Sequence, residues 1–513
     1  MDYDVAIVGY GPTGMVLAAL LGQAGRRVVV LERYAGLYNL PRAAAFDDET
    51  MRTFQKLGIA EKLLAGTNIQ SGYVWVNGQD EVLLDIEYDN PGPCGWPAQY
   101  MMYQPHLEDV LDQHVRGIEG VEVRHGVTVT GLAETDEGVT LTGQSIAGDT
   151  VSLNARYVVG CDGGNGFVRG YLNGQLDDLG FFENWLVCDF QMKRNVPGLP
   201  SFRQICRPEQ PVSIVNIGPS HHRFSFRLEE GDTRESVTAP ERVWPRVADY
   251  LTQDDADLIR VANYTFRSCI VDLWRKGRVM LAGDAAHQMP PFLAQGMVSG
   301  IRDARNLAWK LAMVLDGASG ALLDSYQPER EPHVRFITGK AIELGRVQTM
   351  RDPVEARARD ARMIAARNAN QKPDKLVYPP LSGGLIANHG ALMPQGLVST
   401  TAGTGLFDDI VGTGWLLVAR NSAALAALSA ADVENFAGLG GTTVHFALDE
   451  MVGGAPVFDT NGLYRRWFDK TGAVAALVRP DSHVYGLAET PQALPALLQD
   501  LFAALGAHET VAV

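Results

Sequence analysis

The first 32 residues follow a strand, turn, helix and strand pattern. Residues 4–8 form a short apolar run that predicts a strand, and the glycine-rich segment 9–14 follows it. Residues 15–25 are rich in Ala and Leu and predict a helix, and a second apolar run at 28–31 predicts a strand that ends at Glu32. This order is typical of a β-α-β unit that binds a dinucleotide.

Apolar periodicity predicts further helices and strands up to residue 160, separated by a turn-rich segment at 88–97 that contains Asn-Pro-Gly-Pro. We expect helices at 51–64 and 105–115, and strands within 72–86, 121–129, 138–153 and 157–160. The segment 180–272 is rich in aromatic and β-branched residues and predicts a second, mostly antiparallel sheet. Its expected strands lie at 185–192, 212–217, 222–228 and 261–268.

The second half of the chain begins with a predicted core strand at 278–281 and continues with helices at 296–315 and within 332–370. The Gly- and Pro-rich segment 379–396 predicts a connector. From about residue 400 the pattern predicts a βαβ-type region, with segments at 414–419, 423–428, 443–448 and 473–479 and a final helix at 491–505.

Composition narrows the class of protein. A chain of 513 residues is too long for one ordinary core, so we expect two to four structural units. The chain has 46% hydrophobic and 20% charged residues and no long apolar run, which predicts a globular protein without a membrane span. Its N-terminus does not resemble a leader peptide, so we expect a cytoplasmic protein. A net charge of -16 argues against nucleic acid as a partner. The scattered cysteines suggest neither disulfides nor a metal site: Cys94, Cys161, Cys188, Cys206 and Cys269.

The residues of the first motif suit a dinucleotide. Gly9 permits a tight turn, Gly11 lets backbone N–H groups approach a pyrophosphate, and Gly14 lets the helix pack close to the sheet. Pro12 and Thr13 belong to the same turn, and the N-terminus of the helix that follows carries a partial positive charge that faces the phosphates. Glu32 is placed to accept hydrogen bonds from a ribose. The unit alone does not separate FAD from NAD.

Two later motifs add to the first. Asp162 and Gly163 follow the strand at 157–160; taken alone, this Asp-Gly pair is a common turn. Gly283 and Asp284 follow the strand at 278–281, so that the carboxylate projects at the carboxyl end of that strand. A rigid turn at Pro290-Pro291 then leads into a helix that begins at Gln295-Gly296-Met297.

Together, in this order and spacing, the three motifs resemble those of the single-component FAD-dependent aromatic hydroxylases. The resemblance implies an α/β fold with a Rossmann-like FAD-binding domain (1–179 and 273–398), an interleaved antiparallel-sheet substrate domain (180–272) and a thioredoxin-like C-terminal domain (399–513). The last domain lacks a CxxC pair, since no cysteine follows Cys269. It is expected to contribute to packing or to the interface of a homodimer.

The resemblance also implies which residues contact the cofactor. The Asp-Gly pair lies near the FAD pyrophosphate and the nicotinamide, with Arg169 as the basic residue of that motif. Asp284 binds a ribityl hydroxyl, and the backbone at Gly296 and Met297 faces the flavin N1/C2=O region, where negative charge forms on reduction. Val298 stands where the family often has Asn, which removes one side-chain contact. The implied cofactor residues are Gly9, Gly11, Pro12, Thr13, Gly14, Glu32, Arg33, Arg42, Gln104, Asp162, Gly163, Gly283, Asp284, Pro291, Gly296 and Met297; for Arg42, a solvated surface arginine is the alternative.

Segments 46–49 and 290–304 look most like those of the 3-(3-hydroxyphenyl)propionate hydroxylase group. The implied reaction uses NADH or NADPH, O2 and a flavin C4a-hydroperoxide, without a metal, to hydroxylate a phenolic ring in aromatic catabolism. A phenol has a pKa of about 10, so a base should assist its deprotonation. Asp47 is the candidate base, although Asp47 or Asp48 capping the next helix is an equal alternative. His222 and Tyr264 are further catalytic candidates, Arg203 and His221 could line the pocket, and His287 is expected to pack or hydrogen-bond locally.

Three other functions remain open on the sequence. A tailoring hydroxylase of a larger polyketide or a quinolone-type heteroaromatic would use the same motifs. An NAD-dependent dehydrogenase fits the first motif but not the third, and a flavoprotein that does not hydroxylate would still bind FAD. No second glycine-rich fingerprint is present, so NADH and NADPH are not distinguished.

Overall fold

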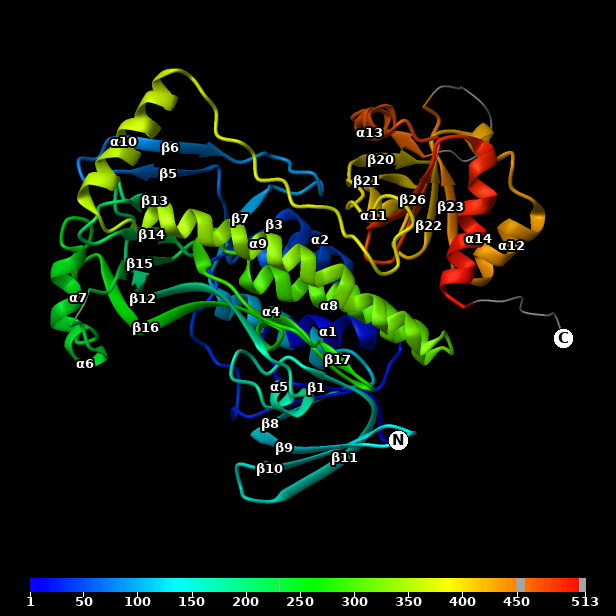
Figure 1. The fold of residues 1–513 in the computed structure, drawn as a ribbon, viewed down its shortest axis with the longest axis horizontal. Coiled ribbons are helices and arrows are strands. Elements are labelled where there is room, and N and C mark those ends of the chain that lie inside the picture. The colour runs from blue at the N-terminus through cyan, green and yellow to red at the C-terminus, as the bar shows by residue number, and fades with distance from the viewer. Residues whose placement is uncertain (230, 449–456, 507–513) are drawn as a thin grey trace. The chain divides into compact units, whose positions relative to one another are not determined.

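A computed structural model describes residues 1–229, 231–448 and 457–506 of the chain. Contacts between Cα atoms divide it into two compact units. The first comprises Met1–Asn90, Pro97–Ala304 and Arg335–Val377, and the second comprises Pro91–Trp96, Arg305–Val334 and the described residues from Tyr378 onward. Both units mix helices and strands, which gives an α/β fold (Figure 1).

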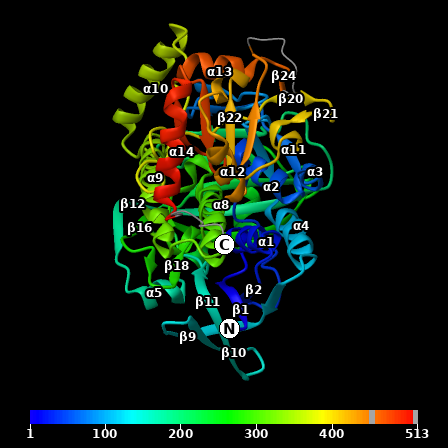
Figure 2. The ribbon, with the colours of Figure 1, turned by 90° about the vertical axis from the view of Figure 1, so that its right-hand side faces the viewer.

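The first unit contains a sheet whose central strands are parallel, in the order β17-β18-β11-β1-β2-β8. β1 pairs in parallel with β2 and with β11, and β11 pairs in parallel with β18. The α1 helix packs beside β1 and β2 (Figure 2). The bounds are β1 Tyr3–Val8, α1 Pro12–Gln23, β2 Val28–Glu32, β8 Val121–His125, β9 Val127–Glu134, β10 Val139–Ser145, β11 Thr150–Gly160, α5 Phe167–Leu172, β17 Arg275–Lys276 and β18 Val279–Leu281.

A second sheet of the same unit has the order β19-β16-β12-β15-β14-β13-β5-β6 and is antiparallel except between β13 and β5. The pattern over 180–272 predicted this sheet, but not that the 72–87 hairpin extends it. Leu186, Phe224 and Phe226 on one face pack in a core with Val243 of α7. The bounds are β5 Gly72–Val76, β6 Val82–Glu87, β12 Leu176–Met192, β13 Phe202–Ile205, β14 Val212–Asn216, β15 His221–Arg227, α6 Arg234–Val237, α7 Pro240–Val247, β16 Ala256–Val271 and β19 His287–Gln288.

Between the glycine turn and the second sheet, the chain forms helices and a small sheet of order β3-β7-β4. The single helix predicted at 51–64 is wrong in one respect: Gly58, with φ of 76°, ends α2, and α3 follows as a separate helix. The bounds are β3 Ala45–Asp47, α2 Asp48–Leu57, α3 Ala60–Leu64, β4 Thr67–Ile69, β7 Gln99–Met102 and α4 Gln104–Arg116.

Long helices follow the third motif. The α8 helix covers Gly296–Leu315, the range predicted from the sequence. The region 332–370 contains two helices. The first begins at Tyr326, earlier than predicted, and Pro332 lies inside it instead of at its start. The bounds are η1 Gly283–Ala285, η2 Pro291–Leu293, η3 Gly320–Ser325, α9 Tyr326–Gln348 and α10 Pro353–Asn368.

The second unit contains a four-stranded sheet of order β23-β22-β25-β26, in which β22 pairs in parallel with β23 and antiparallel with β25. Phe407, Phe446, Tyr464 and Phe468 lie in its core. The bounds are β20 Leu397–Thr400, β21 Gly403–Leu406, α11 Phe407–Ile410, β22 Leu416–Ala419, η4 Ser422–Leu425, α12 Ala430–Gly438, β23 Thr442–His445, β24 Phe458–Asp459, α13 Leu463–Thr471, β25 Ala475–Val478, β26 Val484–Ala488, η5 Pro491–Ala493 and α14 Leu494–Ala504.

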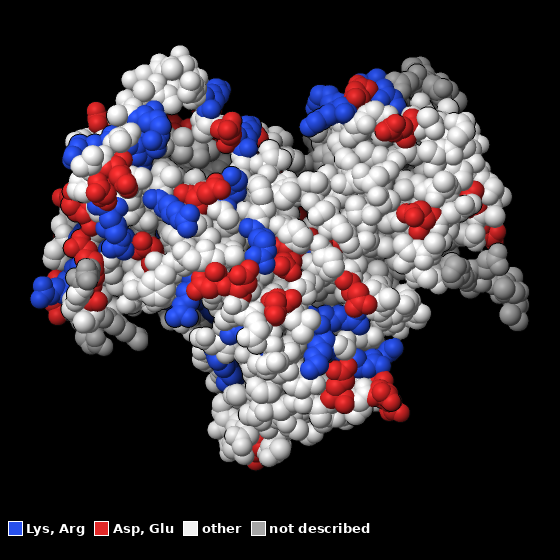
Figure 3. Space-filling view, in the orientation of Figure 1, with Lys and Arg blue, Asp and Glu red and all other residues white. Residues whose placement is uncertain are grey.

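Three features concern the surface and the composition of the described residues. Basic and acidic side chains are interspersed on the face drawn in Figure 3. Within the described ranges, every helix is too short or too polar to cross a membrane. The same ranges hold no group of three His, Cys, Asp or Glu side chains close enough to bind a metal ion.

Candidate active site

The parallel sheet brings the three sequence motifs to one edge. The strands β1, β2, β11 and β18 run in the same direction, so their carboxyl ends lie side by side. Backbone hydrogen bonds connect the ends: Gly9 N–H donates to Leu31 at 2.8 Å and Cys161 N–H donates to Val8 at 2.7 Å. Ala282 N–H donates to Gly160 at 2.9 Å. Segments about 160 and 280 residues from the N-terminus therefore form one surface with the first turn.

The first turn has the shape that a pyrophosphate needs. Gly9 has φ of 104°, and a Cβ there would lie 2.4 Å from the Cys161 carbonyl oxygen. A Cβ on Gly14 would lie 2.2 Å from the Gly9 oxygen, so the helix and the turn touch. A Cβ on Gly11 would meet nothing within 4 Å. Gly11 is also the N-cap of α1 and provides no side-chain cap, so no N-cap side chain competes with a ligand for the first N–H groups of the helix, beginning at Thr13.

The acid at the end of β2 is fixed by the backbone around it. The Glu32 carboxylate accepts the N–H of Tyr10 at 2.8 Å and that of Tyr34 at 3.0 Å. This leaves the carboxylate beside the glycine turn, where it can also accept from ribose hydroxyls. The neighbouring Arg33 is exposed, and its guanidinium lies 5.0 Å from the centre of the Tyr34 ring.

The second motif contains buried polar atoms that are not fully satisfied. Asp162 accepts the Val168 N–H at 3.0 Å through Oδ2, while its Oδ1 is buried without a hydrogen-bond partner. Burial raises the pKa of this carboxyl. Arg169 Nη1 is likewise buried without a hydrogen-bond partner. Gly163, at φ of 80°, turns the chain between Asp162 and α5. An unpaired donor and acceptor beside the sheet edge are suited to a polar ligand.

The third motif is held in place by hydrogen bonds to Asp303 of α8. Asp303 Oδ2 accepts the N–H of Gly283 at 3.0 Å and Nε2–H of His287 at 2.6 Å, and all three residues are buried. His287 thus hydrogen-bonds locally, in agreement with the sequence interpretation. Asp284 is accessible to solvent, yet the protein around it raises the pKa of its carboxyl through desolvation. A partly desolvated carboxylate of this kind suits a hydroxyl donor.

Gln104 positions the loop that contains Arg42. It is buried, its Oε1 accepts the N–H groups of Arg42 at 3.0 Å and of Ala43 at 2.6 Å, and its Nε2 donates to Glu108 at 2.6 Å. The Arg42 guanidinium itself is exposed and lies 4.4 Å from the centre of the Tyr38 ring. Gln104 therefore shapes the loop through its backbone, and Arg42 is the side chain that remains accessible.

The second sheet contacts this loop through residues that the sequence interpretation missed. Arg223 donates to the carbonyl oxygens of Arg42 at 2.7 Å and of Pro41 at 3.0 Å. Asp189, which is fully buried, pairs with Arg223 at 2.6 Å, and Arg260 also donates to the Pro41 carbonyl. Charged residues inside otherwise apolar strands were the available signal, since such residues are rarely buried without a partner.

The register of the second sheet separates two of the candidate catalytic residues. Tyr264 follows Arg260 by four positions on β16, on the loop-facing side, and its hydroxyl accepts from Arg260. His222 is adjacent to Arg223 and therefore faces the opposite side, where its Nε2 donates to the Pro200 carbonyl at 2.9 Å. Burial lowers the pKa of His222 to about 4. This placement does not favour the catalytic role expected for His222, and we do not propose one.

The remaining candidates have local partners. Arg203 Nη2 lies 3.2 Å from Asp80, and the His221 ring stacks on Tyr103 with centroids 3.7 Å apart. Asp47 is the N-cap of α2: its Oδ1 accepts the Thr50 N–H at 3.0 Å, as the capping alternative expected. The other oxygen, Oδ2, accepts from Arg302 at 2.6 Å.

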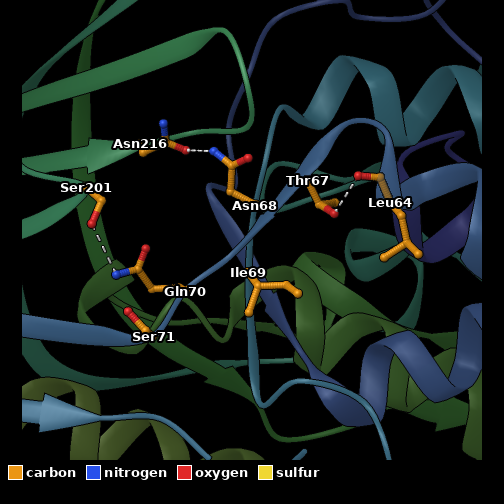
Figure 4. A pocket seen from close by; sticks show the side chains of 8 residues that line it. All are labelled: Leu64, Thr67, Asn68, Ile69, Gln70, Ser71, Ser201 and Asn216. Atoms are coloured by element: carbon orange, nitrogen blue, oxygen red, sulfur yellow. Dashed lines mark hydrogen bonds between the residues drawn. The ribbon is translucent and has the colours of Figure 1, made fainter. Parts of the chain in front are cut away.

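A small apolar cluster packs against Ala294 in the turn that precedes α8. Ala294 packs with Ala45, Met101, Val215 and Ile217 in a small apolar cluster. Nearby, a hollow of about 550 Å³ opens between β4 and the β13–β14 region, and only uncharged residues line it (Figure 4). They are Leu64, Thr67, Asn68, Ile69, Gln70, Ser71, Ser201 and Asn216. An adjoining hollow of about 650 Å³ shares Gln70, Ser71 and Ser201 but also contains Asp85, Glu87 and Arg203.

Comparison with known proteins identifies the family. A profile described as the FAD binding domain matches residues 2–341, and one described as the HcaD C-terminal domain matches 390–504. A protein of Rhodococcus jostii (strain RHA1) named as a probable NADH-specific resorcinol 4-hydroxylase is 66% identical over 503 residues, covering 98% of this chain and 95% of that protein. This chain belongs to the FAD-dependent aromatic hydroxylases. The resemblance seen in the sequence is therefore confirmed.

Two further hydroxylases are similar to this chain at lower sequence identity. A 3-(3-hydroxy-phenyl)propionate/3-hydroxycinnamic acid hydroxylase of Mycolicibacterium gilvum (strain PYR-GCK) is 32% identical, covering 99% of this chain and 94% of that protein. The crystal structure of an aklavinone-11 hydroxylase has a TM-score of 0.79 at 24% identity, covering 98% and 99% of the two chains, and so shows the same fold. The enzyme is an FAD-dependent monooxygenase, and FAD is its cofactor.

The residues present fit FAD. The uncapped start of α1 beside the open position at Gly11 provides donors for a diphosphate. Asp162 Oδ1 and Arg169 Nη1 supply an acceptor and a donor that lack partners within the protein. Glu32 and Asp284 provide carboxylates at the same sheet edge for sugar and ribityl hydroxyls.

Proposed function

We propose that this enzyme hydroxylates resorcinol or a closely related neutral dihydroxybenzene, with NADH as the reductant. The observation that carries the proposal is the 66% identity over 98% of the chain to the probable NADH-specific resorcinol 4-hydroxylase.

We propose that the three motifs together hold FAD at the sheet edge where they lie side by side. The turn at Gly9, Gly11 and Gly14, with Pro12 and Thr13, would bind the pyrophosphate, and Glu32 the ribose. Asp284 would bind a ribityl hydroxyl. The remaining proposed contacts are Arg33, Arg42, Gln104, Asp162, Gly163, Gly283, Pro291, Gly296 and Met297; Gln104 would act by shaping the Arg42 loop.

When bound and reduced by the nicotinamide, FAD supplies the activation of O2. The protein must then exclude water and present the ring in its reactive, deprotonated form. We propose Tyr264 as the side chain that contacts the substrate hydroxyl. Its support is its position on the loop-facing side of β16 and its hydrogen bond from Arg260, which leaves the Tyr264 O–H free to donate.

We propose the finer domain assignment as well: a Rossmann-like FAD-binding domain, 1–179 and 273–398, an interleaved substrate sheet, 180–272, and a thioredoxin-like domain, 399–513. The order β23-β22-β25-β26, with β25 antiparallel to β22, supports the last assignment. We further propose a cytoplasmic homodimer, for which sedimentation of the purified protein is the direct test.

The test of the function is oxidation of NADH and NADPH by the FAD-loaded enzyme with a panel of phenols, together with measurement of hydrogen peroxide. Resorcinol should stimulate NADH oxidation, give little peroxide and yield a trihydroxybenzene. Stimulation with an equal amount of peroxide would make resorcinol an effector only. Preference for a large polycyclic phenol would favour a tailoring hydroxylase and contradict the proposal.

A further inference from the structure

A guanidinium between two carboxylates connects α2 to the turn before α8. Arg302 donates to Asp47 Oδ2, Glu49 Oε2 and Gln295 Oε1, each at 2.6 Å. The Arg302 side chain is 5% exposed, and those of Asp47 and Glu49 are 10% and 14% exposed. These four residues are called the Arg302 cluster below. Their burial strengthens each charge-assisted hydrogen bond.

The Arg302 cluster fixes a turn that does not have a relaxed backbone. Gln295 lies between Ala294, which has a left-handed φ of 55°, and Gly296, where α8 begins. A non-glycine residue keeps such a conformation only when its surroundings impose it. Gln295 is held at both ends, since its Oε1 accepts from Arg302 and its Nε2 lies 3.4 Å from Asp47 Oδ2. The next backbone N–H groups, at Gly296 and Met297, are those expected to face the flavin.

We propose that Arg302 is a positioning residue for the flavin reaction, and that Asp47 orients Arg302 instead of removing a proton from the substrate. Arg302 fixes the 294–297 turn through Gln295, so that the N–H groups of Gly296 and Met297 keep one direction. The inference rests on the proposed function only where it concerns hydroxylation, because the effect of Arg302 on the flavin can be measured without substrate.

The bonding of Asp47 separates a positioning role from that of a base. Its Oδ1 accepts from both the backbone and the hydroxyl of Thr50, and its Oδ2 accepts from Arg302. Both oxygens of the carboxylate are therefore engaged by donors within the protein, which hold it in place beside Arg302. Asn at the same position would keep the N-cap, since Asn and Asp cap helices equally well. It would lose both the charge that faces Arg302 and the hydrogen bond that Asp47 Oδ2 accepts from it, because an amide N–H₂ takes the place of that oxygen.

The experiment compares Arg302→Met with Asp47→Asn, Gln295→Leu and a matched control, Arg359→Met. Arg359 is equally buried and also makes three hydrogen bonds, to Asp360 and to the carbonyl oxygens of Val347 and Cys206, away from the Arg302 cluster. The measurements are the FAD dissociation constant, the flavin midpoint potential, the peroxide formed per NADH and the pH profile of hydroxylation.

We expect Arg302→Met to raise the FAD dissociation constant roughly ten- to a hundredfold, the range for removing a residue that orients a binding group. It should also lower the midpoint potential and increase the share of NADH lost as peroxide. Gln295→Leu should shift the same quantities less, and it serves in place of Arg302→Met if that variant does not fold. Asp47→Asn should keep the pH profile of the wild type, and Arg359→Met should leave the potential unchanged.

Two results would overturn the proposal. If the potentials of the Arg302 and Gln295 variants equal that of the wild type, the turn does not depend on Arg302. If Asp47→Asn abolishes hydroxylation and removes an acidic limb of the pH profile while FAD binding is retained, Asp47 is the base. Failure of the wild type to hydroxylate any dihydroxybenzene would instead contradict the proposed function, because the potentials would still report on Arg302.

Discussion

Replacing Gly11 by Ala separates cofactor binding from folding more sharply than any other single change in the glycine turn. At Gly11 the backbone has an ordinary φ of -87°, and a Cβ meets no protein atom within 4 Å. The fold should therefore tolerate the methyl group. The only structural cost is that Ala is a poorer N-cap than Gly, which amounts to about 1 kcal/mol or less.

The loss of binding free energy for FAD should be much larger than this loss of stability. In the proposed FAD site, a methyl group at Gly11 would occupy the open space through which the diphosphate would reach the N–H groups of α1. Hydrogen bonds to a charged group contribute about 1.5–3 kcal/mol each, so the loss of one or two gives about 3 kcal/mol. Because about 1.4 kcal/mol corresponds to a factor of ten, the dissociation constant of FAD should rise about a hundredfold.

Gly9→Ala provides the contrasting variant. There the φ of 104° disfavours any L side chain, and the Cβ would lie 2.4 Å from the backbone oxygen of Cys161. Backbone strain and overpacking of this kind cost about 2–4 kcal/mol. Gly9→Ala should therefore destabilise the apoprotein, whereas Gly11→Ala should not.

The assay is titration of each apoprotein with FAD, followed by flavin fluorescence, together with urea unfolding without FAD. The reasoning is refuted if Gly11→Ala binds FAD as tightly as the wild type. It is equally refuted if Gly11→Ala unfolds as easily as Gly9→Ala, since the open position at residue 11 would then not be open in solution.

Three further changes test the electrostatics and the backbone. His222 has a pKa of about 4 in the folded state, below its unfolded value of about 6.5, so the unfolded state binds more protons between these two pH values. The free energy of unfolding should therefore fall by about 3 kcal/mol from pH 6.5 to pH 4. His222→Gln should remove this part of the pH dependence, as measured by urea unfolding at each pH. Ala294→Gly should stabilise the apoprotein against urea by about 1 kcal/mol, because φ of 55° costs Ala more than Gly, and a loss of stability would contradict the strain. Glu329→Gln should destabilise by about 3–5 kcal/mol because buried Lys310, 2.8 Å from Glu329, would lose the carboxylate it pairs with, while Arg479 would keep only Asp481; unchanged unfolding would contradict this role of Glu329.

The sequence by itself determined those helices, strands and motifs that depend only on residues close together in the chain. The apolar runs and glycines of residues 4–32 specify a strand, a tight turn and a helix through periodicity and backbone freedom alone, and β1, α1 and β2 lie within two or three residues of that prediction. The α8 helix was predicted over its full range for the same reason. The family followed from the order of motifs, and the missed break at Gly58 was also a local signal, since glycine favours a positive φ.

Only the tertiary structure decided which distant side chains meet. His222 and Arg223 are neighbours in the chain, but the pleat directs one into the α7 core and the other toward the Arg42 loop, and the register that settles this depends on pairing with β12. Asp47 and Arg302 are 255 positions apart, so no local pattern connects them. Local patterns report the backbone that a segment prefers, whereas buried charges are paired by the packing of whole elements, which a single sequence does not display.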